Sequence, residues 1–312
     1  MSRSIFPLVV RMQTHGIESF ISENIQRYQP DLVISIMPFI NLPASEAARK
    51  ANLPFLVITI DNDLENWLLG FESLQHPNFK ITIGADIPTT TGLLEKLNVD
   101  SKDIANIGLP LRPDFICTKT KAELRKEYGV AQGHSVVLLM MGGAGAKRCM
   151  QYAKKIAKMD LKTHLFVCMG KNSDLADKLA KIKKHPGNAV TVLPFTEKIH
   201  DLMTLSDLLV TKPGPGTINE AIATRTPVLL DAIGGVLFWE KINIDLSLER
   251  GIGKPVRNFS ELESNLKDLL FNHDSYQKVR EALKNLQPSQ FIYKIQPLID
   301  EMCQTQKDFV KI

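Results

Sequence analysis

The stretch KPGPGTINEA, from Lys212 to Ala221, is the most informative part of this 312-residue chain. It follows the apolar run 208–210, which predicts a buried strand, and it leads into a helical pattern. Gly214 and Gly216 therefore stand where a strand turns into a helix, and glycine permits positive φ angles and a close approach of the backbone to a ligand. Because a helix start offers free N–H groups with the helix dipole behind them, the stretch predicts a phosphate site.

Glu220 lies one turn into the predicted helix. A carboxylate at this place can accept hydrogen bonds from both hydroxyls of a ribose, and each charged hydrogen bond contributes about 1.5–3 kcal/mol. Without a ligand, an acid near a helix start gains only about 0.3–1 kcal/mol from the dipole. A phosphate cradle followed by a ribose-binding acid predicts a nucleotide-sugar site, and a strand–helix turn with no ligand is the alternative.

The whole string resembles the donor-binding signature of glycosyltransferase family 28. It is most similar to that of the UDP-sugar-dependent monogalactosyl- and diglucosyl-diacylglycerol synthases, which are relatives of the peptidoglycan GlcNAc transferase. The resemblance implies an α/β fold of the GT-B type, with two Rossmann-like domains facing a cleft. It also implies UDP-sugar as a co-substrate, no cofactor and no bound metal. The donor contacts that it implies in this stretch are Lys212, Gly214, Pro215, Gly216, Thr217 and Glu220.

Composition indicates a soluble globular protein with room for two domains: 44% of the residues are hydrophobic and 23% are charged. No apolar run reaches the roughly 20 residues that span a bilayer. The four cysteines show no paired spacing, which fits a reducing cytosol and argues against a zinc site. The lysines of 178–184 predict a solvated helix face, since no aromatic residues interleave with them as in a nucleic-acid groove. We expect a cytoplasmic protein, free or peripheral on the membrane, and no nucleic-acid partner.

Strand-like and helix-like segments alternate along most of the chain, which predicts parallel sheets covered by helices. The predicted strands are 32–36, 55–60, 80–83, 104–107, 135–140, 163–168, 190–193, 208–210 and 228–230. The predicted helices are 43–51, 121–128, a segment ending near 158, 175–184, 199–205 and segments beyond 260.

The segment GLPLRPDF, Gly108–Phe115, breaks this alternation because its two prolines and its glycine disfavour both helix and central strand. It also resembles the link between the two domains of the family. We therefore expect a first, acceptor-side domain over residues 1–112 and a donor-binding domain over residues 113–290. The resemblance implies that a final helix within 291–312 crosses back to the first domain.

Three loops of the second domain extend the resemblance. MMGGAGAKR, 140–148, resembles the glycine loop that faces the sugar diphosphate, and CMGKN, 168–172, resembles a turn of the family with one residue of difference. LPFTEKI, 193–199, resembles the turn that holds the uracil ring by backbone groups. A plain tight turn, a solvated lysine and a core phenylalanine are the alternatives. The donor contacts implied by these loops are Gly143, Gly145, Lys171, Phe195 and Thr196.

The segment GGVLFWEKIN, Gly234–Asn243, corresponds to the stretch that grips the hexose hydroxyls in the family. Glu240 and Asn243 keep the family spacing, but Trp239 stands where the family has Gln. An indole is much larger and cannot accept a hydrogen bond from a hydroxyl. The hexose is therefore open: either a different sugar stacks on Trp239 or the site is weakened.

The first domain departs further from the family. The resemblance places Met1 about 70–100 residues into the family pattern, after the first strand and the Gly-rich loop whose His serves as the base. We therefore expect a truncated first domain, and a partner chain that completes it is one way to restore the missing strand. His15 is expected to be a surface residue rather than the base.

The segment VITIDNDLENW, 57–67, also lacks the family's Asp and His, which are replaced by Ile60 and Leu64. Asp61 and Asp63 are the nearest substitutes for a general base. An ordinary Asp-Asn-Asp turn is the alternative interpretation.

Two functions follow. The first is transfer of a hexose from a UDP-sugar to a lipid hydroxyl at the membrane surface, with the helix start and basic loops stabilising the leaving UDP. Diacylglycerol is preferred over an undecaprenyl-linked sugar as acceptor because KPGPGT is closer to the glycerolipid synthases. The second is a catalytically impaired or partner-dependent UDP-sugar-binding protein with a regulatory role. An epimerase of the same architecture has little support, since no His and carboxylate cluster is evident.

Overall fold

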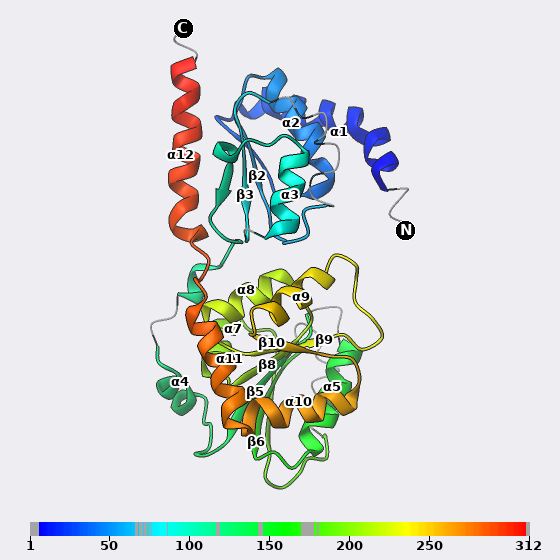
Figure 1. The fold of residues 1–312 in the computed structure, drawn as a ribbon, viewed down its shortest axis with the longest axis vertical. Coiled ribbons are helices and arrows are strands. Elements are labelled where there is room, and N and C mark those ends of the chain that lie inside the picture. The colour runs from blue at the N-terminus through cyan, green and yellow to red at the C-terminus, as the bar shows by residue number, and fades with distance from the viewer. Residues whose placement is uncertain are drawn as a thin grey trace. The chain divides into compact units, whose positions relative to one another are not determined.

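A computed structural model describes residues 6–65, 68, 71, 74, 76–85, 87–116, 119–142, 146–169, 178–179 and 181–309. The chain divides into two compact units (Figure 1). Unit 1 comprises Met1–Leu111 together with Ser289–Ile312, and unit 2 comprises Arg112–Pro288. The sequence placed the corresponding boundaries at residues 112 and 290.

Unit 1 is built on a four-stranded parallel sheet with the order β1-β2-β3-β4. Its strands are β1 (Val33–Ser35), β2 (Phe55–Ile58), β3 (Phe79–Ile83) and β4 (Ile104–Asn106). Its helices are α1 (Phe6–Tyr28), α2 (Asn41–Lys50), α3 (Pro88–Lys96) and α12 (Phe291–Phe309), with short 3-10 turns at Pro38–Ile40 and Ser101–Asp103.

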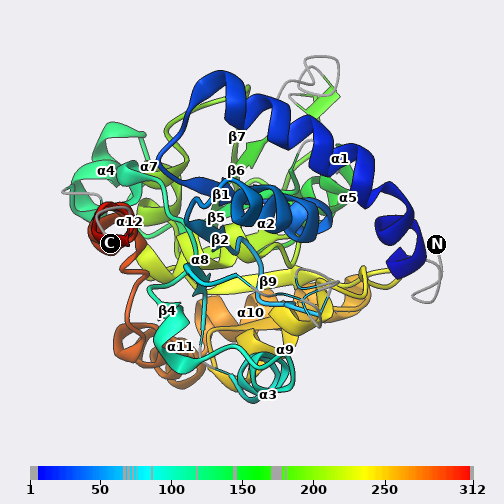
Figure 2. The same ribbon diagram turned by 90° about the horizontal axis from the view of Figure 1, so that it is seen from above.

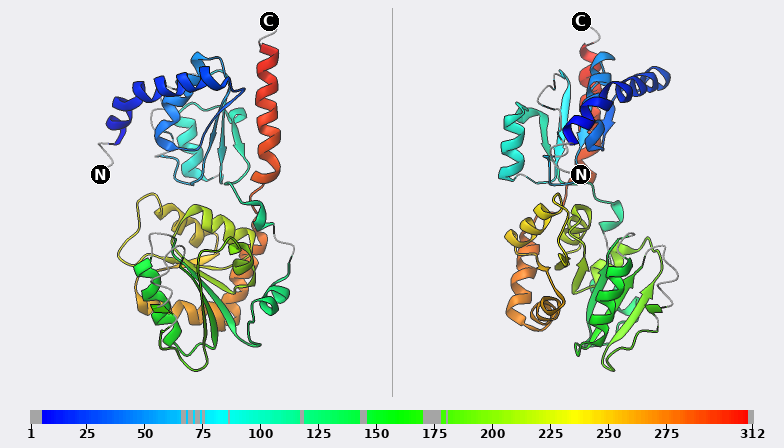
Figure 3. Two further views of the ribbon diagram at one scale, coloured as in Figure 1. Left: turned by 180° about the vertical axis from the view of Figure 1, so that it is seen from behind. Right: turned by 90° about the vertical axis from the view of Figure 1, so that its right-hand side faces the viewer.

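Both faces of the first sheet are covered, and β2 shows how. All four of its side chains are buried. Phe55 and Val57 belong to a core with residues of α2 and α3, whereas Leu56 and Ile58 pack with Leu298 and other residues of α12. A strand buried on both faces is continuously apolar, which is why its sequence does not alternate. Figure 2 shows α1 lying along α2, and Figure 3 shows α12 as a straight helix beside the sheet.

Unit 2 is built on a six-stranded sheet with the order β10-β9-β8-β5-β6-β7, in which every pairing is parallel. Its strands are β5 (Ser135–Met140), β6 (Thr163–Cys168), β7 (Ala189–Leu193), β8 (Leu208–Thr211), β9 (Val228–Asp231) and β10 (Gly253–Val256). Its helices are α4 (Lys121–Glu127), α5 (Ala146–Lys158), α7 (Ile199–Leu205), α8 (Pro215–Ala223), α9 (Lys241–Glu249), α10 (Phe259–Phe271) and α11 (His273–Asn285), and a 3-10 turn spans Pro113–Phe115.

The edge strand β10 departs from ordinary strand composition because it contains both Gly253 and Pro255. A Cβ atom on Gly253 would lie 2.2 Å from the carbonyl oxygen of Val228, so the neighbouring strand leaves room for glycine alone. Pro255 is tolerated because a terminal strand does not need every N–H group for pairing. The central strands β6 and β8 are fully buried, as expected of a parallel sheet covered on both faces.

Each strand predicted from the sequence overlaps a strand of the structure, and the alternation of strands and helices is confirmed. The sequence did not predict α3, α9 and β10. His15 lies inside α1 with its side chain exposed, so the expected surface position is confirmed. The helix predicted for 175–184 is wrong at its end, since 181–184 are not helical; residues 175–177 and 180 lie outside the described residues.

None of the helices in the described part of the chain is long and apolar enough to cross a membrane.

Candidate functional site

The start of α8 is the centre of the site. β8 ends at Thr211, and α8 begins at Pro215, a residue that suits the first helical position because its missing N–H group is not needed there. Gly214 is the N-cap, with φ of −78° and ψ of 135°, and no side chain caps this end. The first N–H groups of any helix lack intrahelical partners, so this end is available to an anion.

Gly214 and Gly216 do not use the positive φ angles that glycine permits. Gly214 is extended, Gly216 lies within α8, and neither is among the glycines with positive φ. What the two glycines provide is space, because a Cβ atom on either would meet no atom within 4 Å. The absence of side chains therefore leaves the helix start open to a ligand. The backbone conformation at these two positions does not itself require glycine.

Glu220 is held by a residue from far away in the sequence. Nε and Nη2 of Arg112 both donate to Oε1 of Glu220, at 3.3 Å and 3.1 Å. The side chain of Glu220 is 18% exposed and that of Arg112 is 49% exposed. Burial raises the pKa of the Glu220 carboxyl above its usual range, and the charge and hydrogen bonds of Arg112 act in the opposite direction.

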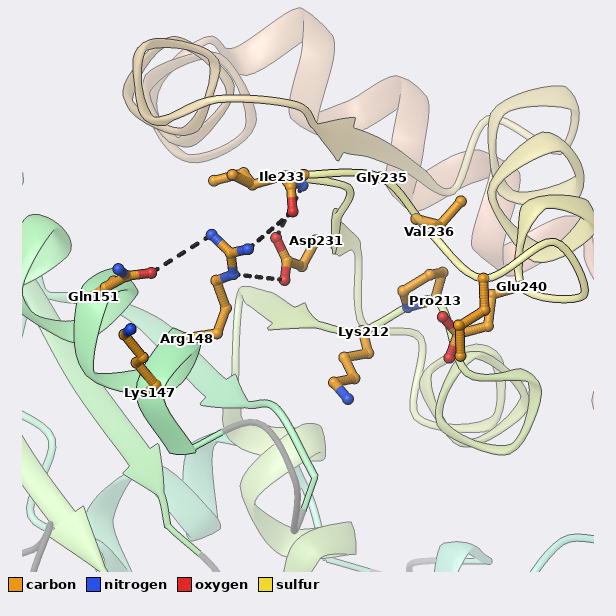
Figure 4. Close-up of a pocket in the computed structure, with 12 residues that line it drawn as sticks. Lys147, Arg148, Gln151, Lys212, Pro213, Asp231, Ile233, Gly235, Val236 and Glu240 are labelled. Atoms are coloured by element: carbon orange, nitrogen blue, oxygen red, sulfur yellow. Dashed lines mark hydrogen bonds and ion pairs between the residues drawn. The ribbon is translucent and has the colours of Figure 1, made fainter. Parts of the chain in front are cut away.

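A pocket of about 720 Å³ opens beside this helix start within unit 2 (Figure 4). It joins the helix start of α5, the loop after β8 and the loop after β9. Its lining residues are Lys147, Arg148, Gln151, Lys212, Pro213, Asp231, Ile233, Gly234, Gly235, Val236, Leu237 and Glu240. Three cations and two carboxylates therefore surround one cavity, which suits a ligand with both phosphates and hydroxyls.

One wall of the pocket is fixed by Asp231, at the end of β9. Its carboxylate accepts hydrogen bonds from the Tyr152 hydroxyl at 2.8 Å and from the Ile233 N–H at 3.2 Å, and it lies 3.4 Å from Nε of Arg148. Arg148 also donates to the carbonyl oxygen of Ile233 at 2.9 Å, as Figure 4 shows. Burial, followed by the nearby Asp231 charge, raises the pKa of the Tyr152 hydroxyl, which keeps it a donor. This network holds the loop after β9 in place.

The loop after β9 needs glycine for its shape. Gly234 and Gly235 have φ values of 79° and 94°, in the left-handed region that side chains disfavour. From this loop, Leu237 and Glu240 line the pocket. Trp239 is 39% exposed and packs edge-on against Phe238, with ring centroids 4.7 Å apart.

Asn243 differs from the other predicted hexose contacts. It lies in α9 and is only 1% exposed. Its backbone N–H donates to the Glu240 carbonyl oxygen, and its own carbonyl oxygen accepts from the Ser247 hydroxyl at 2.7 Å. This geometry favours a role inside the helix over direct contact with a sugar.

Phe195 and Thr196 lie in the loop after β7 and are not among the pocket residues. The ring of Phe195 is 59% exposed, so the alternative of a core phenylalanine is wrong. The hydroxyl of Thr196 accepts a hydrogen bond from the Lys198 N–H at 3.1 Å, which holds the turn. Gly143, Gly145 and Lys171 lie outside the described residues.

Asp61 and Asp63 belong to unit 1 and form a turn after β2. Oδ1 of Asp61 accepts from the N–H groups of Asn62 at 2.7 Å and Asp63 at 3.3 Å, and Oδ1 of Asp63 accepts from the Glu65 N–H at 3.2 Å. Carboxylates that accept backbone hydrogen bonds in this way are ordinary turn residues. Thr59, just before them, is fully buried and bonded to Thr82 of β3.

Sequence reasoning missed four contributors to the site: Arg112, Arg148, Asp231 and the Gly234-Gly235 pair. The double glycine after a strand was a visible signal for a special turn. The two arginines carried no local signal, because each acts on a residue far away in the sequence. Across the described residues, no group of three or more His, Cys, Asp or Glu side chains is placed to hold a metal ion.

Comparison with known proteins agrees with this geometry. Residues 136–230 match the glycosyltransferase family 28 C-terminal domain. This range runs from β5 to β9 and includes the α8 start, Glu220 and part of the pocket wall.

Two curated relatives match most of the chain. The processive diacylglycerol beta-glucosyltransferase of Bacillus subtilis (strain 168) is 26% identical over 268 residues, covering 85% of this chain and 67% of the relative. The chloroplastic monogalactosyldiacylglycerol synthase of Spinacia oleracea is 31% identical over 309 residues, covering 93% of this chain and 56% of the relative. The chain thus spans about half to two thirds of the length of these curated relatives.

The crystal structure of Acinetobacter baumannii MurG matches with a TM-score of 0.64 and 13% identity, covering 89% of this chain and 76% of that one. At this identity the likeness shows the fold, two parallel-sheet α/β domains of the GT-B type. Residues 136–230 therefore match the glycosyltransferase family 28 C-terminal domain, in a chain that has the GT-B fold and is similar to diacylglycerol glycosyltransferases.

Proposed function

We propose that this protein transfers a hexose from a UDP-sugar to a lipid acceptor, with diacylglycerol as the preferred acceptor. The observation that carries the proposal is the pocket of about 720 Å³ in unit 2, which brings cations and carboxylates together beside the residues that lead into α8. Relatives named as diacylglycerol glycosyltransferases cover 85% and 93% of the chain, which supports the acceptor class.

The diphosphate of the donor is assigned to the start of α8, with Lys212 and Lys147 as nearby cations. Gly214, Pro215, Gly216 and Thr217 supply a surface on which phosphate oxygens approach the backbone. As the bond from the sugar to the diphosphate breaks, negative charge grows on the leaving UDP. The helix dipole and these cations stabilise that charge without reorganising.

The remaining donor groups follow from this placement. Glu220 accepts hydrogen bonds from the ribose hydroxyls, and the exposed loop with Phe195 and Thr196 is assigned to the uracil. The hexose is assigned to the pocket beside Glu240 and the loop after β9. Gly143, Gly145 and Lys171 stay proposed donor contacts, whereas for Asn243, which is 1% exposed, we propose that it supports α9 without touching the sugar.

The acceptor side is assigned to unit 1, where a small apolar patch lies at the carboxyl ends of two strands. The residues that follow β1 and β2 include exposed apolar side chains, between 39% and 52% exposed: Ile36, Met37, Phe39 and Ile60. Because ligands of parallel α/β folds lie beyond the carboxyl ends of the strands, this patch suits a lipid better than a sugar. We propose peripheral contact with a membrane through the same patch.

The general base stays unassigned in this proposal. Since Asp61 and Asp63 already accept backbone hydrogen bonds, we propose that they shape the turn after β2 and do not deprotonate the acceptor. A partner chain is proposed at β1, which is the terminal strand of the sheet formed by the described residues. A terminal strand can pair with another strand through the backbone groups on its outer edge.

The proposal is tested by incubating the protein with radiolabelled UDP-glucose or UDP-galactose and dioleoylglycerol in mixed micelles. We expect a labelled glycolipid, formed at least about tenfold more slowly by Glu220→Ala because a charged hydrogen-bond acceptor for the donor is lost. UDP binding without transfer to any acceptor would contradict the transferase and favour the alternative of a UDP-sugar-binding protein.

A further inference from the structure

The linker segment between the two units contributes a charged group to the donor half. Arg112 is the first residue of unit 2, and it precedes the 3-10 turn Pro113–Phe115. Its guanidinium lies over the ring of Phe115, with Cζ 4.9 Å from the ring centroid. Phe115 is only 3% exposed and packs edge-on against the ring of His200 in α7. The guanidinium therefore rests on a fixed surface, unlike the flexible partner of an ordinary surface ion pair.

Both hydrogen bonds from Arg112 end on the same oxygen of Glu220. Nε and Nη2 converge on Oε1, while Oε2 accepts no hydrogen bond from the described residues. A carboxylate oxygen accepts through two lone pairs, so Oε2 stays available for ligand hydroxyls. The arginine thus fixes the direction of the carboxylate and leaves one edge of it open.

We propose that Arg112 is a positioning residue that holds the carboxylate of Glu220 so that its open edge accepts the 2′- and 3′-hydroxyls of a ribose. The inference rests on the proposed function, because it takes Glu220 as the ribose-binding acid. It adds to that function the feature of the ligand that Arg112 and Glu220 together recognise, which is a vicinal diol on a nucleoside diphosphate. It also assigns a binding role to a segment whose sequence indicated only a link between domains.

The charge of Arg112 has a second consequence, for the pH dependence of binding. Burial pushes the pKa of Glu220 upward, and Arg112 is the neighbouring charge that pulls it down. Glu220 must be ionised to accept two hydroxyl hydrogen bonds, so ribose-dependent binding is lost as the pH falls through this pKa. Without Arg112 the upward effect of burial is unopposed, and the loss must begin at a higher pH.

A different effect on nucleotide binding is expected if the contact is an ordinary exposed ion pair. Such pairs contribute little, because two long side chains are held in high-dielectric surroundings. If Arg112–Glu220 were of this kind, removing the arginine would change neither the affinity for nucleotide nor its pH dependence. The pair Arg257–Glu261 serves as the matched control, since its atoms lie 3.7 Å apart at the exposed start of α10, away from the pocket residues.

The test is titration calorimetry of UDP and of 2′,3′-dideoxy-UDP between pH 5 and pH 8. The proteins are the wild type, Arg112→Ala, Arg112→Lys, Glu220→Gln, the double variant Arg112→Ala/Glu220→Gln and Arg257→Ala. Circular dichroism and the melting temperature establish that each variant is folded. We expect Arg112→Ala to bind UDP about tenfold more weakly at pH 7, a change of about 1.4 kcal/mol, and to lose affinity at a higher pH than the wild type.

Dideoxy-UDP should bind Arg112→Ala and the wild type equally, because the ligand lacks the diol. Arg112→Lys should restore the pH dependence more than the affinity, since lysine supplies charge without the forked geometry. In the Glu220→Gln background, Arg112→Ala should add less than about twofold, because the two residues act as a unit. Arg257→Ala should match the wild type throughout.

Two results would overturn the inference. Unchanged affinity and unchanged pH dependence in Arg112→Ala would make the contact an inert surface pair. An equal loss for UDP and dideoxy-UDP would mean that Arg112 acts on the phosphates. A wild-type protein that binds no UDP, or a Glu220→Gln variant that binds it normally, would instead refute the proposed function itself.

Discussion

The two sheets present opposite chemistry at the carboxyl ends of their strands. In unit 2, Asp231 at the end of β9 lines a polar pocket, together with Lys212 after β8 and the Gly234-Gly235 turn after β9. In unit 1, the residues that follow β1 and β2 include Met37 and Ile60, whose apolar side chains are exposed. The same kind of sheet therefore carries a polar pocket in one unit and exposed apolar side chains in the other. The difference matches a reaction between a nucleotide sugar and a lipid.

The largest effect is expected in the polar pocket of unit 2. Asp231→Asn should lower kcat/KM for UDP-hexose by about 100-fold, because the carboxylate joins Arg148, Tyr152 and the loop after β9, and breaking such a network leaves charged and polar groups unpaired. Tyr152→Phe removes one hydrogen bond of the same network and should cost about threefold to tenfold. Steady-state kinetics on both variants provides the measurement. A loss of less than about threefold in Asp231→Asn would show that this wall of the pocket does not contribute to kcat/KM for UDP-hexose.

A smaller effect is expected at the small apolar patch of unit 1. Met37→Asp places a charge among exposed apolar side chains and should lower turnover on diacylglycerol in vesicles by about tenfold, because an ionised carboxylate resists transfer to an apolar surface. Its affinity for UDP should stay that of the wild type. Leu248→Asp in α9 is the matched control, since Leu248 is 45% exposed and Met37 is 49% exposed. Equal losses in both variants would remove the contrast between the two units.

Trp239 tests how the polar pocket selects a sugar. Trp239→Gln restores the residue type that the family has at this position and should change the ratio of kcat/KM for UDP-glucose and UDP-galactose by a few-fold, since an amide can bond to a hydroxyl. Binding of UDP itself should not change, because the indole packs on Phe238 at the exposed surface. An altered UDP affinity with an unaltered sugar ratio would place Trp239 outside the hexose site.

The smallest effect is expected for Asp61→Asn. Asparagine keeps an acceptor for the N–H groups of Asn62 and Asp63, so the turn survives and turnover should fall by less than about threefold. The pH–rate profile is the deciding measurement. A drop of 100-fold or more together with a changed profile would identify Asp61 as the general base.

The sequence predicted most of the fold because its buried strands are short and rich in β-branched residues. FLVI and LLVT lie in parallel sheets covered on both faces, and such runs are readable without tertiary information. β10 was missed because GKPV contains both Gly and Pro, and its conformation depends on the close approach of Val228. Here the neighbouring strand, rather than local propensity, decides the structure.

In the candidate site, too, features carried by a local stretch of sequence were predicted, and features that depend on tertiary contacts were not. The α8 start and Glu220 were evident because a local string carries them. Arg112 bonds to a residue 108 positions away, and the two residues meet only after the chain has folded. Gly214 and Gly216 do not use the positive φ angles that glycine permits, because the turn between β8 and α8 needs space and not a left-handed backbone. Positive φ angles occur at Gly234 and Gly235, in the loop after β9.

The central claim is that unit 2 binds a uridine nucleotide with Glu220 at the ribose. Titration calorimetry of UDP against the wild type and Glu220→Ala tests it most directly. We expect binding by the wild type and an affinity at least about tenfold lower in the folded variant, which corresponds to a loss of about 1.4 kcal/mol or more. No binding of UDP by the wild type, or equal binding by both proteins, would contradict it.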